Sequence, residues 1–342
     1  MALRQSTSFQ LLSFGSIMQD PLPEIPWIVE PLLAQGERGL VYGEWGSYKS
    51  WLLMDLAIHL AAGQPWLNHF TIPTPRRVLY IDEEMSEIAL RRRMKQLGLG
   101  TRLEETLQTS LPLQFVQQAG LEFTEPAKAT QLLEDLLLHD FQPEVIILET
   151  FRRVFQGDEN LAREVAKFWK AVHPLIQDGR ALLLSHHMSK PSYTGTRNVR
   201  DRASGSTDIM AGADSAFALS LQKGTDRIVK VDHVKSRLGE ASPPFSFTLE
   251  APQDQQTARL LLMDQTAGSI PGREFCQQML EDWLNERQGQ TIRTKEVKAF
   301  LQQQQLSERS AEREWREYRD QHKLNKIKQG CYAVPIQQHP AA

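Results

Sequence analysis

Short apolar runs alternate with amphipathic stretches from Ile28 to about Leu262. The runs predict strands, which are Gly39–Tyr42, Arg77–Ile81, Val145–Leu148, Ala181–Leu184, Ala216–Leu221 and Arg227–Val231. The stretches predict helices, which are Ser50–Ala62, Ile88–Leu97, Thr130–Leu138 and Arg163–Ile176. Nearly continuous apolar strands that alternate with helices indicate an α/β fold, with a parallel central sheet that helices cover on both faces.

The rest of the chain follows a different pattern. At about 100–200 residues per domain, 342 residues predict two domains. Residues 1–25 lack periodicity and predict an arm, the α/β domain spans 26–264, and 265–272 contain the Gly, Ser and Pro of a linker. Within 273–338, three amphipathic segments precede two short apolar runs around Gly330, which is the order of a small winged-helix domain. The segments are Glu274–Arg287, Thr294–Gln304 and Ser307–His322, followed by Ile327–Val334.

Composition and charge limit the class of protein and its expected location in the cell. Lys plus Arg is 39 and Asp plus Glu is 42, so a net charge of −3 excludes a globally basic coat for nucleic acid. No apolar run reaches the roughly 18 residues of a membrane span, and the N-terminus lacks the pattern of a signal peptide. Cys276 and Cys331 fit neither a metal site nor a disulfide framework. We therefore expect a cytoplasmic protein without a membrane partner.

The strongest chemical signal lies between the first predicted strand and helix. It reads Gly43-Glu44-Trp45-Gly46-Ser47-Tyr48-Lys49-Ser50. A loop of this kind in this setting turns backbone N–H groups toward phosphate oxygens, with the lysine at the terminal phosphates and the serine on Mg²⁺. Tyr48 stands where the pattern has its second glycine, and a helical backbone angle there would tolerate a side chain. The alternative interpretation is a surface turn with an incidental Lys-Ser pair.

Acidic residues follow two other predicted strands. Asp82, Glu83 and Glu84 end one strand and Glu149 ends another, and ligands of parallel sheets bind at this carboxyl edge. One acid of the first group could polarise the water that attacks the γ-phosphate, and Glu149 could hold Mg²⁺ through its water. The alternatives are an acidic helix cap and a strand with an acidic end.

Histidine and basic residues complete the candidates. His186 and His187 end the strand at Leu184 and could sense the γ-phosphate; a metal site lacks a third ligand, and structural histidines remain an alternative. A loop with three arginines could face DNA, and a later Lys-x-Arg pair could reach the nucleotide of a neighbouring subunit as an arginine finger does. The alternative is a solvated basic surface. These residues are Arg197, Arg200, Arg202, Lys235 and Arg237.

The order of these motifs resembles a RecA-like ATPase, most of all the hexameric replicative helicases of the plasmid RepA type, which are relatives of the DnaB family. The resemblance covers roughly residues 25–250. It rests on Ile25–Leu33, Gly43–Ser50, Tyr80–Glu84, Ile146–Thr150, Ser185–Lys190 and Lys235–Gly239. It implies that ATP and Mg²⁺ are bound, that the chain forms a ring, and that single-stranded DNA passes through it.

The same resemblance implies roles for individual residues. Lys49 and Ser50 bind phosphate and Mg²⁺, Glu84 is the catalytic acid, and Glu149 coordinates the metal. His187 senses the γ-phosphate, and the pair Lys235 and Arg237 reaches across the subunit interface. The departures from the family pattern are Tyr48, Glu149, which is usually Asp, and Ser204, where the family has Arg.

The small C-terminal domain lies outside the resemblance. Its third predicted helix would present basic residues to duplex DNA and the hairpin would add two more. Glutamates alternate with them, so a protein partner is nearly as strong an alternative. The basic residues are Arg309, Arg313, Arg316, Arg319, Lys323, Lys326 and Lys328, and the acidic ones are Glu308, Glu312, Glu314 and Glu317. Three functions therefore stay open: a helicase or translocase in replication of a plasmid or mobile element, an ATP-switched DNA-binding or loading factor, and an interaction protein with a decayed site.

Overall fold

The computed structural model describes most of the large domain and parts of the small one. It describes residues 12–101, 110–188, 207–222, 228–250 and 256–263. In the small domain it describes residues 280–281, 283–284, 287, 289–303, 311–312, 315–316, 318–319, 324, 326–328 and 330–333.

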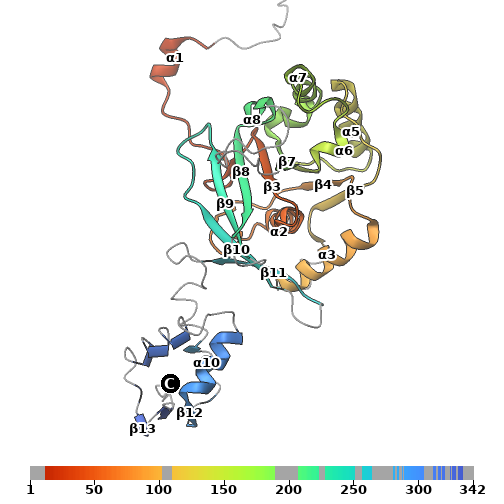
Figure 1. Cartoon of the computed structure of the whole chain (residues 1–342). Coiled ribbons are helices and arrows are strands. Elements are labelled where there is room, and N and C mark those ends of the chain that lie inside the picture. Colours follow the sequence, from red (N-terminus) through yellow and green to blue (C-terminus); the bar gives the residue numbers. More distant parts are fainter. Residues whose placement is uncertain are drawn as a thin grey trace, which may run out of the picture.

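A nine-stranded sheet forms the centre of the large domain (Figure 1). Its order is β11-β10-β9-β8-β3-β7-β6-β4-β5, in which the strands from β8 to β5 are parallel and β9, β10 and β11 continue antiparallel. The strands are β3 (Arg38–Gly43), β4 (Val78–Asp82), β5 (Leu113–Gln117), β6 (Val145–Glu149), β7 (Ala181–His187), β8 (Ser215–Leu221), β9 (Ile228–Lys235), β10 (Phe245–Glu250) and β11 (Arg259–Met263).

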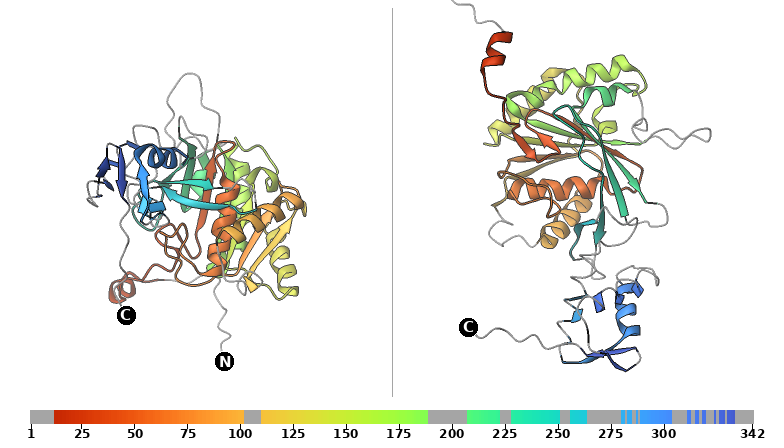
Figure 2. Two further views of the ribbon diagram at one scale, coloured as in Figure 1. Left: turned by 90° about the horizontal axis from the view of Figure 1, so that it is seen from below. Right: turned by 90° about the vertical axis from the view of Figure 1, so that its left-hand side faces the viewer.

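Helices cover both faces of this sheet, as Figure 2 shows in its right-hand view. One face carries α2 (Lys49–Ala62) and α3 (Glu87–Gly100). The other face carries α5 (Pro126–Leu138), α6 (Phe151–Val154), α7 (Ala162–Ala171), the 3₁₀ helix η1 (His173–Gly179) and α8 (Thr207–Gly212). The predicted α/β class with a mainly parallel central sheet is thus confirmed.

Alternation along the strands divides the core in two. In β4, Val78 and Tyr80 belong to the α2 side, whereas Leu79 and Ile81 belong to the side of α5 and α7. Both sides of each central strand are buried, which explains why these strands are apolar throughout rather than at alternate positions. The same alternation decides which polar residues at the strand ends face α2.

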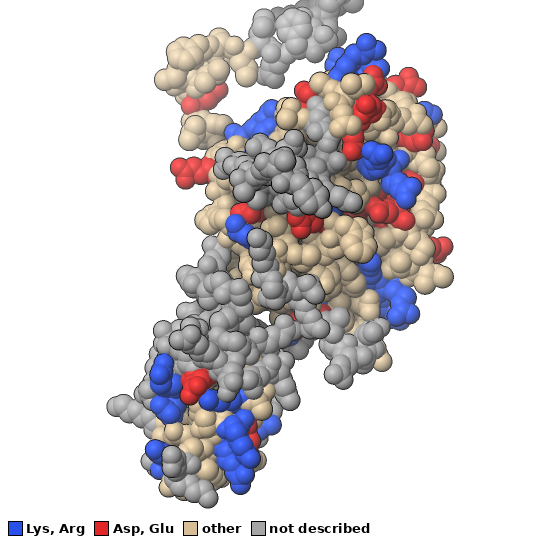
Figure 3. Space-filling model, in the orientation of Figure 1, with Lys and Arg blue, Asp and Glu red and all other residues tan. Residues whose placement is uncertain are grey.

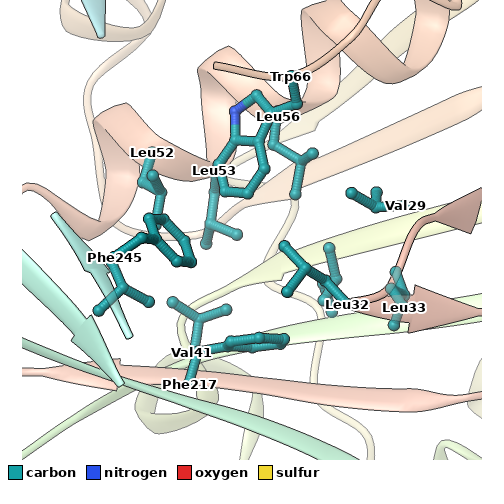
Figure 4. Close-up of a pocket in the computed structure, with 12 residues that line it drawn as sticks. Val29, Leu32, Leu33, Val41, Leu52, Leu53, Leu56, Trp66, Phe217 and Phe245 are labelled. Carbon is teal, nitrogen blue, oxygen red and sulfur yellow. The ribbon is translucent and has the colours of Figure 1, made fainter. Parts of the chain in front are cut away.

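A small cavity lies between α2 and the sheet (Figure 4). Its volume is about 30 Å³, and its lining is apolar. Leu52 and Leu56 of α2 face Val41 of β3 and Phe217 of β8 across it. A space of this size could hold one water molecule, but a water needs polar partners that this lining does not offer, so the cavity belongs to the hydrophobic core.

Several elements differ from the sequence prediction. The single helix predicted over Arg163–Ile176 is wrong, because α7 ends at Ala171 and the 3₁₀ helix η1 begins at His173. Pro174 has no N–H to continue the α-helical ladder, which accounts for the break. The arm contains the exposed helix α1 (Phe14–Gln19), which Ser13 caps, and the following residues form a hairpin of β1 (Trp27–Val29) and β2 (Leu33–Ala34).

The small domain has a core of its own. Its described elements are β12 (Thr291–Arg293), α10 (Thr294–Gln303), β13 (Lys326–Lys328) and β14 (Cys331–Ala333), and the strands form a sheet in the order β12-β14-β13. Trp315, Tyr332 and Leu301 are buried together. The predicted hairpin around Gly330 is present, with Gly330 at a φ of 72°, whereas β12 was not predicted. The winged-helix assignment stays a prediction, and the predicted linker 265–272 lies outside the described residues.

Candidate active site

The loop between β3 and α2 has the backbone of a phosphate-binding loop. Gly46 has a φ of 80° and Tyr48 a φ of 56°, so both adopt the left-handed conformation. The helical angle that would have tolerated a side chain at Tyr48 is therefore not present, and the tyrosine occupies a conformation that glycine favours. The loop keeps the shape of the glycine pattern despite the departure in its sequence.

Lys49 and Ser47 stabilise this loop from within. The ammonium Nζ of Lys49 donates to the carbonyl oxygens of Gly43 and Glu44, at 3.1 and 3.0 Å. The hydroxyl of Ser47 donates to the same Glu44 carbonyl at 2.7 Å. Burial lowers the pKa of Lys49, while the nearby Glu149 and Glu84 act in the opposite direction. The lysine thus lies over the loop, among the acids that end the neighbouring strands.

Glu149 lies at the end of β6, directly opposite Asp82 of β4. The hydroxyl of Ser50 donates to its Oε1 at 2.6 Å, and the hydroxyl of Tyr80 donates to its Oε2. Burial raises the pKa of Glu149 to about 7, and these two hydrogen bonds oppose that shift. The predicted metal acid and the predicted metal serine are therefore in direct contact.

The three acids after β4 occupy different surroundings. Asp82 is buried, and its Oδ1 accepts hydrogen bonds from the backbone N–H groups of Glu84 and Met85, both at 2.8 Å. Glu83 points to the neighbouring loop, where its carboxylate accepts from the N–H groups of three consecutive residues, Ala119, Gly120 and Leu121, at 3.0–3.2 Å. Glu84 is exposed, and no side-chain hydrogen bond of Glu84 occurs among the described residues.

Charge effects place Glu84 beside the phosphate loop. Its carboxylate raises the pKa values of Lys49, Glu149 and His187, although burial is the larger influence on each. These three side chains come from α2, β6 and β7. Glu84 therefore lies where the elements converge, whereas Glu83 is directed elsewhere.

The two histidines of β7 point to opposite faces. His187 pairs in register with Gly43, and burial followed by the charge of Lys49 lowers its pKa, so a neutral ring is favoured. His186 is buried on the other face, where its ring packs against Phe151 at 4.9 Å. Alternation along the strand thus rules out a shared metal for this pair. The described residues contain no group of three or more His, Cys, Asp or Glu that could hold a metal ion.

A comparison with known protein families matches residues 4–193, more than half of the chain, to the model of the AAA domain. The chain belongs to the AAA domain family. With its loop and its mainly parallel sheet, this AAA domain protein is a RecA-like P-loop ATPase, as the motif order implied. No match was found among curated proteins.

Solved structures similar to this AAA domain protein share little sequence with it. One of them, an ATPase domain, is 10% identical with a TM-score of 0.50, covering 67% of this chain and 86% of that one. A KaiC-like protein of Pyrococcus horikoshii OT3 is 13% identical (TM-score 0.47; 69% and 94% covered), and the flagellar accessory protein FlaH of Methanocaldococcus jannaschii is 14% identical (TM-score 0.41; 63% and 86% covered). At these identities the likeness concerns the fold alone.

The predicted pair Lys235 and Arg237 lies at the other edge of the AAA domain sheet. Nζ of Lys235 donates to the carbonyls of Met210, Ala211 and Ala213 at the end of α8, at 2.6–3.2 Å. Arg237 donates to the carbonyl of Ala211 and forms an ion pair with Asp214 at 3.0 Å. Within one chain, both basic residues therefore hold the end of α8.

Asp214 also fixes the beginning of β3. Its carboxylate accepts two hydrogen bonds from the Arg38 guanidinium and one from the Arg38 backbone N–H. Arg38 begins β3 and Gly43 ends it, so the two lie five residues, or roughly 16 Å, apart along the strand. An arginine side chain cannot span that distance, and Arg237 cannot reach the phosphate loop of its own chain.

The remaining basic candidates are described only in part. Arg197, Arg200, Arg202 and Ser204 lie outside the described residues, as do Arg309, Arg313 and Lys323. In the small domain, Arg316 and Lys326 are exposed, and Figure 3 shows Lys and Arg side chains gathered on its visible face. Arg319 is only partly exposed, and it instead lies over the ring of Tyr332 and donates to its hydroxyl at 3.1 Å.

Helices that could span a membrane are not found in the described part of the chain.

The residues at the carboxyl edge of the sheet fit a hydrated Mg²⁺ that a nucleotide brings. Magnesium prefers oxygen ligands and is bound through one or two protein groups together with phosphates and waters. The Ser50 hydroxyl and the Glu149 carboxylate supply such oxygens 2.6 Å from each other.

Proposed function

We propose that this ATPase hydrolyses ATP with Mg²⁺ in a homo-oligomeric, hexameric ring, and that it works on DNA as a helicase or translocase in replication of a plasmid or mobile element. The observation that supports this most is the separation of the site into two parts. Lys49, Ser50, Glu149, Glu84 and His187 lie at one edge of the sheet, whereas Lys235 and Arg237 lie at the other. A second copy would bring the two parts together.

The residues at the carboxyl edge have different roles in ATP hydrolysis. The loop N–H groups from Gly43 to Ser50 and the Lys49 ammonium bind phosphate oxygens. Ser50 and Glu149 would hold the Mg²⁺, which would neutralise charge on the phosphates when bound. Glu84 is exposed and near Lys49, so it accepts the proton of the attacking water. A neutral His187 can donate a hydrogen bond to the γ-phosphate and so detect it.

The DNA part of the proposal rests on the small domain and on the family resemblance. The small domain, read as a winged helix, would bind duplex DNA through exposed basic residues such as Arg316 and Lys326. Single-stranded DNA would pass through the ring. The opposite charge of Glu312, which is also exposed, keeps a protein partner as the competing interpretation of this surface.

Turnover of ATP by the wild type and by Lys49→Ala tests the ATPase site. Lys49→Ala removes the charge that binds the phosphates and not a part of the apolar core, so we expect hydrolysis to be abolished in a protein that keeps its fold. Lys170→Ala, an exposed lysine of α7, is the matched control and should hydrolyse ATP normally. Near wild-type turnover by Lys49→Ala would refute the assignment of the phosphate loop.

Two further measurements separate a helicase from an ATP-switched DNA-binding or loading factor. Native mass spectrometry with and without ATP and DNA measures whether six copies assemble. Strand displacement on a forked DNA substrate then measures unwinding. A hexamer that displaces a strand supports the proposal, and ATP-dependent DNA binding without displacement supports the loading factor.

A further inference from the structure

The acid at the end of β6 is a glutamate, and its side chain is held at both oxygens. Glutamate has one more methylene than aspartate, which adds roughly 1.5 Å of reach and one more rotatable bond. A longer carboxylate with one more rotatable bond is oriented for a metal by hydrogen bonds from neighbouring groups. The surroundings of Glu149 show which group does so.

Tyr80 comes to Glu149 from the neighbouring strand. β4 and β6 are parallel neighbours in which Tyr80 lies opposite Ile147, and the side chains of Tyr80, Ile147 and Glu149 belong to the α2 face of the sheet. The Tyr80 ring is fully buried, and its hydroxyl donates to Oε2 of Glu149. Because Ser50 donates to Oε1, each carboxylate oxygen has one fixed partner.

The hydroxyl of Tyr80 is more than a consequence of core packing. A phenylalanine would fill the same volume between β4 and α2 without placing a polar group in an apolar core. A buried hydroxyl without a hydrogen bond is costly, and here the bond is made to the predicted metal acid.

We propose that Tyr80 is a positioning residue for the metal site, which holds the longer Glu149 carboxylate so that its Oε1 faces Ser50 and the Mg²⁺ that accompanies a nucleotide. This inference rests on the proposed ATPase function. Partners that orient a metal-binding side chain change metal affinity by about 10- to 100-fold when they are removed. An aspartate at 149 would be too short to contact the Tyr80 hydroxyl and Ser50 together, so the tyrosine matters only with glutamate.

A double-mutant cycle in the full-length protein tests the pairing. The variants are Tyr80→Phe, Glu149→Asp and the double variant, and a fluorescent ATP analogue is titrated with Mg²⁺ and then with EDTA. We expect Tyr80→Phe to weaken Mg²⁺-dependent nucleotide binding about tenfold or more and to leave binding in EDTA unchanged. In the Glu149→Asp background, Tyr80→Phe should change neither the Mg²⁺-dependent binding of the nucleotide nor its binding in EDTA. Tyr332→Phe, a buried tyrosine of the small domain, is the matched control.

Each outcome separates this inference from the proposed function. A wild type whose nucleotide binding does not respond to Mg²⁺ would refute the proposed site itself. A wild type that responds, with a Tyr80→Phe variant that binds equally well, would refute only the role of Tyr80, as would an equal loss in both backgrounds.

Discussion

The carboxyl edge and the amino edge of the central sheet carry different chemistry. At the carboxyl edge, a phosphate loop meets acids from β4 and β6, and one of these acids, Glu84, makes no side-chain hydrogen bond among the described residues. At the amino edge, Lys235 and Arg237 are cations whose donors are used by the end of α8 and by Asp214. The first edge has an exposed carboxylate beside the phosphate loop, whereas the second has two cations that are bound to groups of the same chain.

The difference between the edges bears on the proposed ring. Phosphoryl transfer depends on cations near the transferred phosphate, and an arginine supplied by another subunit accelerates it strongly. Arg237 is half exposed and pairs with Asp214, which binds Arg38 at the beginning of β3, and the phosphate loop starts at the other end of that strand, roughly 16 Å from Arg38. The comparison between the edges is therefore tested most directly by variants that disable one edge at a time.

The largest effect is expected at the amino edge. Arg237→Ala should bind ATP normally and hydrolyse it about 10³-fold more slowly, since a finger acts on the transition state. A mixture of Arg237→Ala and Lys49→Ala subunits should recover part of the activity, because some interfaces then join an intact Lys49 to an intact Arg237. Steady-state turnover of the mixture and of each variant alone measures this.

Co-assembly must be verified by native mass spectrometry before that result is interpreted. A co-assembled mixture that stays inactive would show that Arg237 does not act between subunits. Turnover of Arg237→Ala at the wild-type rate would show that Arg237 only anchors the end of α8.

The next prediction compares two neighbouring glutamates at the carboxyl edge, Glu84 and Glu83. Glu84→Gln should bind ATP and turn over about 10²-fold more slowly or worse, because an amide cannot accept the proton of the water. Glu83→Gln should be milder, because its carboxylate is bound to the N–H groups of Ala119, Gly120 and Leu121. Single-turnover hydrolysis distinguishes them, and a larger loss for Glu83→Gln would reverse the assignment.

The smallest effect concerns the strained residue of the phosphate loop. Tyr48→Gly and Tyr48→Ala both remove the aromatic ring, but only glycine adopts a φ of 56° without penalty. We therefore expect Tyr48→Gly to be more stable than Tyr48→Ala by roughly 1 kcal/mol. Chemical denaturation of the two variants measures the difference, and equal free energies of unfolding would mean that the left-handed angle carries no strain.

Much of the fold could be predicted from the sequence because the central strands are buried on both sides. Such strands are unbroken apolar runs, and β3, β4, β6 and β7 lie where those runs predicted them. Three strands towards the two ends of the sheet, β5, β10 and β11, were missed. β5 has only partly buried or exposed positions, and β10 alternates Phe245 and Phe247 with polar residues, so neither forms a continuous run.

The placement of the candidate site residues was predictable where a motif is local and not where it depends on pairing between strands. Lys49, Ser50 and Glu149 each follow a strand in the sequence, and the structure brings Ser50 and Glu149 into contact. The hydrogen bond between Tyr80 and Glu149 joins residues 69 positions apart, and only the register of β4 and β6 reveals it. The hydrogen bonds of Lys235 to α8 likewise have no local signal.

The three hydrogen bonds of Lys235 have a thermodynamic consequence. Its ammonium group has three N–H donors, and the carbonyls of Met210, Ala211 and Ala213 accept all of them. A ligand that drew Lys235 away would have to compensate for their loss, and it would at the same time release the end of α8. Coupling between two sites is reciprocal. A partner that loosened the end of α8 would therefore strengthen the binding of that ligand by the same factor by which the ligand strengthens the binding of the partner.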